Sequence, residues 1–304
     1  MIDAPLTAPP ALAELATAVW RTLAYADGFD YPLTAVEIHR YLERVPASLA
    51  EVEKVLARSR QKIGSFRENK LVSYYTLPGR EALGRVREER EARARQLWPH
   101  ARHYARRISR LPFVRMVAVT GSLAMNNVTP DADVDYLIVT EHGRLWLCRA
   151  FIIGVTRLAA RRGVILCPNY ILSQNALRFP EQNLYTAREL CQMVPLSGPA
   201  VYWKMRRLNE WTERFLPNAA GLPPTAAPPQ PTRSRLQKWA ELPLRTAAGG
   251  CLERWEMNRK IRKLETATPP SSEARFTANQ CKGHFQTHQR RAIQSYRERV
   301  MQDA

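Results

Sequence analysis

The chain has 304 residues, of which 45% are hydrophobic, so a wholly disordered protein is excluded and two domains with extensions are favoured over one small domain. Its five cysteines (148, 167, 191, 251 and 281) are odd in number and form no CxxC pair, which argues against a disulfide framework and indicates a reducing compartment. The sequence has neither a signal-peptide pattern nor an apolar stretch long enough for a bilayer, so we expect a cytoplasmic protein without a membrane partner.

The net charge of +18 is unevenly distributed along the chain. Residues 1–78 carry nine basic and nine acidic side chains, whereas residues 79–110 carry ten arginines and four glutamates. Residues 233–304 carry fifteen basic and seven acidic side chains. Such clusters are typical either of a polyanionic partner, such as nucleic acid or the phosphates of a nucleotide, or of a solvated surface. Both interpretations remain open, and the first includes weak nucleic-acid contact through the basic regions.

The first 78 residues predict three helices followed by a hairpin. Apolar residues recur at helical spacing, and Thr34 and Ser48 each begin a helix with a glutamate three residues later, which is a capping box. After Gly64, two short alternating runs predict the strands of a hairpin. This order of elements predicts a winged helix-turn-helix over residues 1–78.

The rest of the chain divides where the pattern changes. An arginine-rich run predicts one long helix that Pro99 should kink. A segment with three strand-like runs follows, and a proline-rich stretch after it predicts a linker or an irregular strap. The predicted α+β architecture comprises a winged-helix domain (1–78), a linking helix (79–111), a small mixed-sheet domain (112–216), a Pro-rich linker (217–234) and a basic helical C-terminal region (235–304).

The chemically informative segment joins a β-branched strand, which ends at Gly121-Ser122, to a second strand that begins with Asp133-Val134-Asp135. A turn at Gly121 lets the backbone approach a phosphate, and Ser122 adds a hydroxyl. Because side chains alternate along a strand, Asp133 and Asp135 share one face while Val134 points to the core. Mg²⁺ commonly takes one or two such carboxylates together with substrate phosphates. The segment therefore predicts a site for a magnesium-bound nucleoside triphosphate.

This arrangement resembles the nucleotidyltransferase superfamily of the DNA polymerase β type. The family signature is an apolar residue, Gly, Gly or Ser, about a dozen residues, and then acid-apolar-acid. Gly121, Ser122, Asp133 and Asp135 match it, whereas Thr120 stands where an apolar residue is preferred. The resemblance covers about a fifth of the chain. The whole chain also resembles bacterial proteins that join a winged-helix start to such a domain, which implies a fold and no substrate.

The resemblance implies a magnesium-dependent enzyme that moves a nucleoside monophosphate from a nucleoside triphosphate to an acceptor. Gly121 and Ser122 would bind the nucleotide, and Asp133 and Asp135 would bind the metal and act in catalysis. An alternative is that the acids only edge a polar turn before a half-buried strand. Asp131, which follows Thr129-Pro130, is expected to shape that turn rather than to bind metal.

Active members of this superfamily usually supply a third carboxylate from a later strand. Here the polar inward candidate of that strand is Asn169, whose amide can ligate a metal but cannot act as a base near neutral pH. Glu181 and Glu189 are later acids that remain candidates. We therefore expect slow or acceptor-restricted transfer, and we expect Asn169→Asp to raise activity or metal affinity.

Two weaker patterns are open to more than one interpretation. Cys281, His284 and His288 have the spacing of three metal ligands on one helix face, but solvated residues on a basic tail explain them better than zinc does. Arg149 lies on the helix after the second strand. It could reach a phosphate, although we favour pairing with a local carboxylate.

A second function, from a different class, also fits these patterns: a winged-helix regulator whose nucleotidyltransferase domain senses nucleotide without turning it over. The N-terminal module is neutral overall, and its third helix begins with Glu51 and Glu53, which would repel DNA. We therefore expect this module to pack against the transferase domain or a partner chain rather than to read a DNA sequence.

Overall fold

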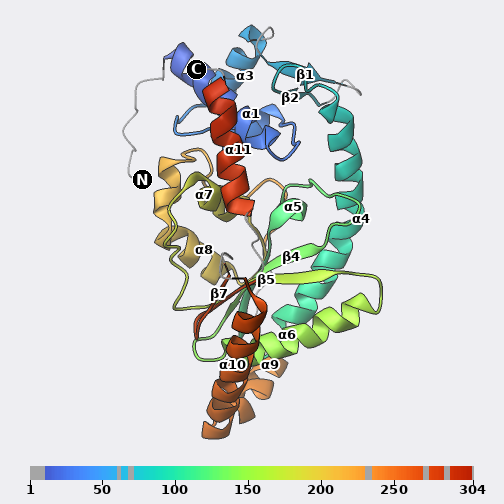
Figure 1. Cartoon of the computed structure of the whole chain (residues 1–304), viewed down its shortest axis with the longest axis vertical. Coiled ribbons are helices and arrows are strands. Elements are labelled where there is room, and N and C mark those ends of the chain that lie inside the picture. Colours follow the sequence, from blue (N-terminus) through green and yellow to red (C-terminus); the bar gives the residue numbers. More distant parts are fainter. Residues whose placement is uncertain are drawn as a thin grey trace.

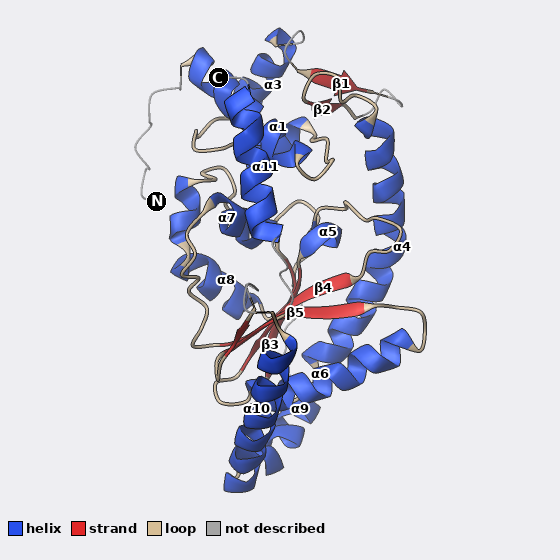
Figure 2. Ribbon diagram, viewed as in Figure 1, coloured by secondary structure: helices blue, strands red, loops and turns tan. Residues whose placement is uncertain are grey.

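The computed structural model of the protein describes residues 11–59, 63–67, 72–229, 235–269, 274–283 and 288–302. A six-stranded sheet lies near the middle of the molecule, between an N-terminal helical unit at one end and the helices of residues 235–267, which project from the other (Figure 1). Helices lie on both sides of the sheet, and the predicted α+β class is confirmed (Figure 2). Within the described residues, no helix is long and apolar enough to cross a membrane.

The N-terminal unit consists of three helices and a two-stranded antiparallel sheet. Both predicted capping boxes are present, because the side chains of Thr34 and Ser48 each accept from the backbone N–H of a glutamate three residues later. The order of these elements agrees with a winged helix, and the winged-helix assignment itself stays a prediction. The elements are α1 (Leu12–Asp27), α2 (Ala35–Arg40), α3 (Leu49–Arg58), β1 (Gly64–Phe66) and β2 (Tyr74–Thr76).

The predicted linking helix is α4 (Leu83–Ser109), which contains Pro99. It begins after a turn at Gly79, whose φ of 77° lies in the left-handed region. Its N-terminal half is fastened to the N-terminal unit by the buried Arg87, which pairs with Glu37 at 2.9 Å. Its C-terminal half packs on the central sheet. The helix is thus a structural element shared by both ends of the molecule.

The central sheet is mixed, as predicted, with strand order β6-β3-β4-β5-β8-β7. β4 and β5 are parallel, and the other neighbouring pairs are antiparallel. Three of the strands were predicted, although the strand-like run predicted for β5 begins at Val164, two residues before the strand itself. The strands are β3 (Val114–Val119), β4 (Val134–Thr140), β5 (Leu166–Ser173), β6 (Val194–Ser197), β7 (Arg275–Phe276) and β8 (Gln280–Lys282).

Helices cover both faces of this sheet. The face that carries Tyr136 packs against α4 and α6, and the face that carries Leu137 packs against α7 and α8. Because side chains alternate along β4, Asp135 lies on the same face as Leu137. The remaining helices are α5 (Gly121–Ala124), α6 (Leu145–Ala160), α7 (Leu184–Gln192), α8 (Pro199–Leu208), α9 (Arg235–Glu241) and α10 (Ala247–Ala267), with 3-10 turns η1 (Glu210–Arg214) and η2 (Pro243–Arg245).

The C-terminal region, predicted as basic and helical over residues 235–304, is mainly helical but also contains two short strands that were not predicted. Residues 274–283 contain β7 and β8, and β8 pairs with β5 in the central sheet. These strands have two and three residues, which is too short for an alternating pattern to be recognised. The chain then returns as α11 (His288–Gln302), which packs against α1 and α7 (Figure 1).

The described part of the proline-rich stretch, residues 217–229, is a strap laid on the protein surface. Arg40 of α2 donates to the carbonyls of Ala220 at 3.0 Å and Gly221 at 3.2 Å. Ala219, beside them, is buried. Of the two interpretations of this stretch, the described residues support the strap. Residues 230–234 lie outside the described part of the chain.

The N-terminal unit packs against the mixed-sheet domain, in agreement with the expectation from its neutral charge. Arg188 of α7 donates to the Tyr41 carbonyl at 3.2 Å, and the Tyr31 hydroxyl donates to the carbonyl of Met125. Side chains of both parts also share one hydrophobic cluster, in which Tyr25 contributes from α1. The two parts therefore form one continuous body, and a surface of the N-terminal unit is buried against the domain.

Candidate functional site

Strand β3 ends in a turn that places Gly121 against Asp135. The Thr120 N–H donates to the Asp135 carbonyl at 3.0 Å, and Gly121 has a φ of 62°. A Cβ atom at Gly121 would lie 2.3 Å from Oδ2 of Asp135, so both the backbone conformation and the close contact require glycine. Ser122 follows in α5 and lines the same cavity as the carboxylates. The structure thus brings the predicted turn and the predicted acids together.

Asp133 and Asp135 flank Val134 in the sequence, and Val134 is fully buried. The two aspartates therefore share the other face of the strand, as the alternation predicts. Burial raises the pKa of the Asp135 carboxyl to about 7, and the charge of Asp133 adds to this rise. Two partly buried carboxylates that lie two residues apart on one face of a strand repel each other. A divalent cation between them would offset both the repulsion and the cost of burial.

Cys167 is a site residue that the sequence analysis missed. It is the register partner of Asp135 on the parallel strand β5, and one ligand atom each from Asp133, Asp135 and Cys167 lie within 4.8 Å of one another. Pairing resumes at Tyr170, so β5 has one residue more than β4 in this interval, and Pro168 lies in the resulting bulge. Spacing alone could not identify Cys167, because its position depends on strand register.

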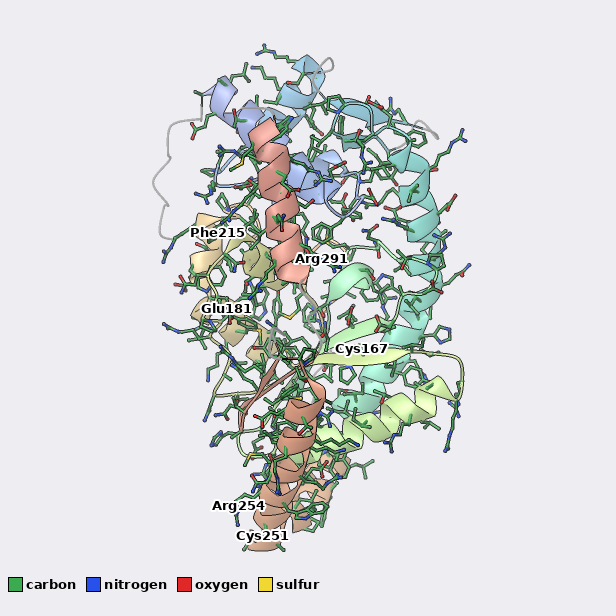
Figure 3. The ribbon with its side chains drawn as sticks, in the orientation of Figure 1. Cys167, Glu181, Phe215, Cys251, Arg254 and Arg291 are labelled. Carbon is green, nitrogen blue, oxygen red and sulfur yellow. The ribbon has the colours of Figure 1, made fainter. Side chains whose placement is uncertain are left out.

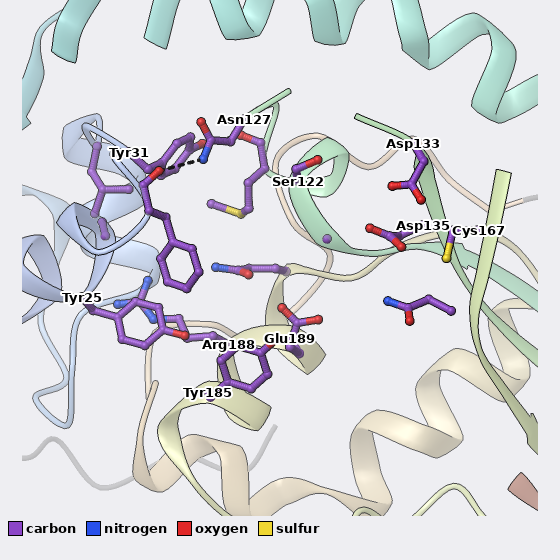
Figure 4. Close-up of a pocket in the computed structure, with 17 residues that line it drawn as sticks. Tyr25, Tyr31, Ser122, Asn127, Asp133, Asp135, Cys167, Tyr185, Arg188 and Glu189 are labelled. Carbon is purple, nitrogen blue, oxygen red and sulfur yellow. Dashed lines mark hydrogen bonds between the residues drawn. The ribbon is translucent and has the colours of Figure 1, made fainter. Parts of the chain in front are cut away.

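The two carboxylates of this group fit a divalent cation. Carboxylate oxygens suit Mg²⁺ and Mn²⁺, whereas a thiolate suits softer ions. No second group of three candidate ligands this close together occurs in the part of the chain that the structure describes. Figure 4 shows the carboxylates of Asp133 and Asp135 beside the sulfur of Cys167, all on one side of a cavity.

Of the two later acids, Glu189 reaches this cavity and Glu181 does not. The Glu189 carboxylate, on α7, lies between the acidic side and the opposite wall (Figure 4). Burial raises its pKa to about 7, while the charge of Lys282 acts in the opposite direction. Glu181 lies 3.8 Å from Arg275 and lines a smaller neighbouring cavity. Asn169, the predicted inward residue of β5, also lines the main cavity.

The cavity has a volume of about 520 Å³ and lies between the mixed-sheet domain and the N-terminal unit. This volume is within the range of small-molecule and cofactor sites. The N-terminal contribution could not be read from the sequence, because it depends on how the two parts pack. The residues that line the cavity from the N-terminal unit are Tyr25, Ala26, Phe29, Tyr31 and Leu33.

The other candidates lie outside this site. Asp131 is exposed and belongs to neither the cavity lining nor the ligand group. Arg149 is not among the residues that line the cavity. It contacts Cys281, and its guanidinium lies 5.9 Å from the centre of the Trp146 ring. Cys281 is buried in the core, and His284 lies outside the described residues.

Two substitutions on β5 test which of its inward side chains, Cys167 or Asn169, lies nearer to the bound cation. Cys167→Asp would place a third carboxylate beside Asp135 and should raise Mg²⁺ affinity by about tenfold, because Mg²⁺ prefers oxygen ligands. Asn169→Asp, two residues further along the same strand, should raise this affinity less. Titration with Mg²⁺ in calorimetry checks this order. A larger gain from Asn169→Asp would mean that Asn169, and not Cys167, is nearest to the cation.

Residues 102–188 match the family model of the nucleotidyltransferase domain. The match extends from α4 into α7 and contains the Gly121–Ser122 turn, both aspartates and Cys167. It covers less than a third of the chain and leaves out the N-terminal unit. Neither a curated protein nor a solved structure matches the chain significantly.

Proposed function

We propose that the protein moves a nucleoside monophosphate from a magnesium-bound nucleoside triphosphate to an acceptor, because residues 102–188 match the family model of the nucleotidyltransferase domain. The observation that carries this proposal is the convergence of the Gly121–Ser122 turn, Asp133 and Asp135 in one cavity. In such a reaction the acceptor attacks the α-phosphorus, a new phosphorus–acceptor bond forms and pyrophosphate leaves. Bound Mg²⁺ would neutralise the phosphate charge and orient the leaving group.

Each group of the chain has a defined task in this proposal. Asp133 and Asp135 would hold the cation, and the Cys167 thiol lies beside them. The backbone at Gly121 and the hydroxyl of Ser122 contact the phosphates. Glu189 is the remaining carboxylate in the cavity lining, and it accepts the proton that the acceptor loses.

The alternative is a regulator that binds nucleotide and does not turn it over. It is favoured by the inward side chains of β5, because Cys167 and Asn169 occupy the strand that usually supplies the third acid in active members of the superfamily. In this function the cavity and its cation would be used in the same way, and binding would change the surface that the N-terminal unit presents.

Incubation with triphosphates labelled at the α-phosphate, with Mg²⁺ and with or without cell extract, distinguishes the two functions. The enzyme is expected to release pyrophosphate and to transfer label to an acceptor from the extract. Retention of the label on the intact protein as unreacted triphosphate, under every condition, would favour the regulator. Failure to bind any triphosphate would contradict both.

DNA binding by the full chain is expected to be weak and steeply dependent on salt. Arg87 is buried in ion pairs, but Arg95, Arg102 and Arg106 are exposed on α4 and can contact phosphates. Changing these three to Gln should reduce the slope of log affinity against log salt by about one unit per lost contact. The measurement is fluorescence anisotropy with several duplex sequences across a salt series. Sequence-selective binding below micromolar concentration near physiological salt would contradict this expectation.

The basic residues at the start of α10 are distant from the cavity. Cys251 and Arg254 on α10 lie at the end of the molecule opposite the N-terminal unit, and Cys167 lies between these two ends (Figure 3). Any nucleic acid bound to α10 would therefore contact a surface other than the cavity mouth.

A further inference from the structure

One wall of the cavity is aromatic and belongs to the N-terminal unit. Tyr25, Phe29 and Tyr31 line this wall together with Met125 from the end of α5. Figure 4 shows Tyr25 and Tyr31 on the side opposite Asp133 and Asp135, with Ser122 and Glu189 between them. The cavity therefore has an acidic side that can hold a metal and a separate side built for a planar or apolar group.

Phe29 is the open surface of this wall. Its side chain is 41% exposed, whereas Tyr25 and Tyr31 are each 5% exposed. Both neighbouring tyrosines are held in place, because the Tyr31 hydroxyl donates to Glu37 at 2.9 Å and the Tyr25 ring lies 5.5 Å from that of Phe29. An exposed phenyl ring inside a cavity costs solvation free energy unless a ligand covers it.

The backbone that carries Phe29 is fixed at several points. Its N–H donates to the Ala26 carbonyl at 3.0 Å, and its own carbonyl accepts from Arg90 and from Asn127, each at 3.2 Å. Asn127 follows α5, so the backbone of Phe29 is hydrogen-bonded directly to the segment that carries Ser122. A surface held in this way loses little entropy when it binds a ring.

A buried cation that also lines the cavity and a further ring contact Tyr25. The Arg188 guanidinium lies 4.5 Å above the Tyr25 ring, and Arg188 is 2% exposed. Tyr296 of α11 meets the Tyr25 ring edge-on, with ring centroids 5.8 Å apart. Gln192 also lines the cavity, and its amide can both donate to and accept from the edge of a heterocycle.

We infer that this wall binds the nucleobase of the triphosphate, with Phe29 as the stacking surface. This inference rests on the proposed function, which places the phosphates at Ser122 and the two aspartates. The base, unlike an aliphatic group, combines a flat face for Phe29 with polar edges for Gln192. The N-terminal unit is then a part of the nucleotide site, which explains why its inner surface packs against the mixed-sheet domain and does not contact DNA.

The test compares nucleoside triphosphates with inorganic triphosphate on the full chain in the presence of Mg²⁺. Calorimetry should show that the wild type binds a nucleoside triphosphate more tightly than inorganic triphosphate. Phe29→Ala should weaken nucleoside triphosphate binding by about 10- to 100-fold, the usual effect of a lost stacking partner. It should leave the affinity for inorganic triphosphate unchanged, and Phe29→Trp should retain tight nucleotide binding.

Trp203→Ala is the matched control, because Trp203 is 42% exposed and lies outside the cavity. It should change neither affinity. Unchanged nucleotide binding by Phe29→Ala would overturn the inference and leave the proposed function intact, even if transfer slowed, since the wall would then serve the acceptor. An equal loss for both ligands would also overturn it, by indicating a structural role for the ring. A wild type that binds neither ligand would refute the proposed function and the inference with it.

Discussion

Replacing Asp133 and Asp135 together by Asn is expected to abolish the thermal stabilisation that a nucleoside triphosphate with Mg²⁺ gives the wild type. At a ligand concentration of 100 times Kd this stabilisation is about 2.7 kcal/mol. Transfer should fall by about 1000-fold or more, because a bound metal supplies several kcal/mol of transition-state stabilisation. Differential scanning fluorimetry and a pyrophosphate-release assay check both effects.

The unliganded double variant should not melt below the wild type. Desolvation and the charge of Asp133 raise the pKa of Asp135, which means that the ionised pair opposes folding, and the substitution removes this repulsion. Asp131→Asn is the matched control, because Asp131 is an exposed acid of the same segment. It should keep the full stabilisation by ligand. An undiminished shift in the double variant would place the nucleotide elsewhere.

Gly121→Ala is expected to remove metal and triphosphate binding with the fold retained. The new Cβ would lie 2.3 Å from Oδ2 of Asp135, so the carboxylate or the turn must move. A displacement of about 1 Å at a reacting group can cost about 100-fold in rate. The left-handed φ of 62° adds strain of about 1–3 kcal/mol to the folded state.

Gly143→Ala separates the two costs of that substitution. Gly143 has a φ of 67°, close to that of Gly121, but a Cβ there would meet no atom within 4 Å. In chemical denaturation both variants should lose the stability that the left-handed φ costs, Gly121→Ala at least as much as Gly143→Ala, and only Gly121→Ala should lose Mg²⁺-dependent binding. Equal activity of the two variants would show that the contact with Asp135 is unimportant.

The parts of the fold that were predicted correctly are those that depend on residues close together in the sequence. The capping boxes at Thr34 and Ser48 depend on residues three apart, and the pairing of Asp133 with Asp135 depends on residues two apart. Patterns of this kind involve only residues close together in the sequence, so they can be recognised without knowledge of the tertiary structure. The turn at Gly121 was equally local, because a close backbone approach requires glycine at one position.

The parts that were missed depend on contacts between distant segments. Cys167 joins the acids because β5 pairs in parallel with β4 and bulges at Pro168, and neither fact is visible in one segment. The strand β6 escaped prediction because it has four residues, one of them Pro195. The aromatic wall at Phe29 belongs to a different part of the chain, so its place in the site follows only from tertiary packing.

The strands at the outer edges of the central sheet also bear on self-association. β5 contains the apolar run Tyr170, Ile171 and Leu172, which would be open to pairing with another chain if its free side were uncovered. The strand β8 occupies that side by pairing with all three residues, and the sheet then ends in β7, which has only two residues. At the opposite edge, Pro195 interrupts the N–H groups of β6. Loss of the β7–β8 segment would therefore expose the apolar edge of β5. We expect the protein to aggregate through this edge before it loses activity.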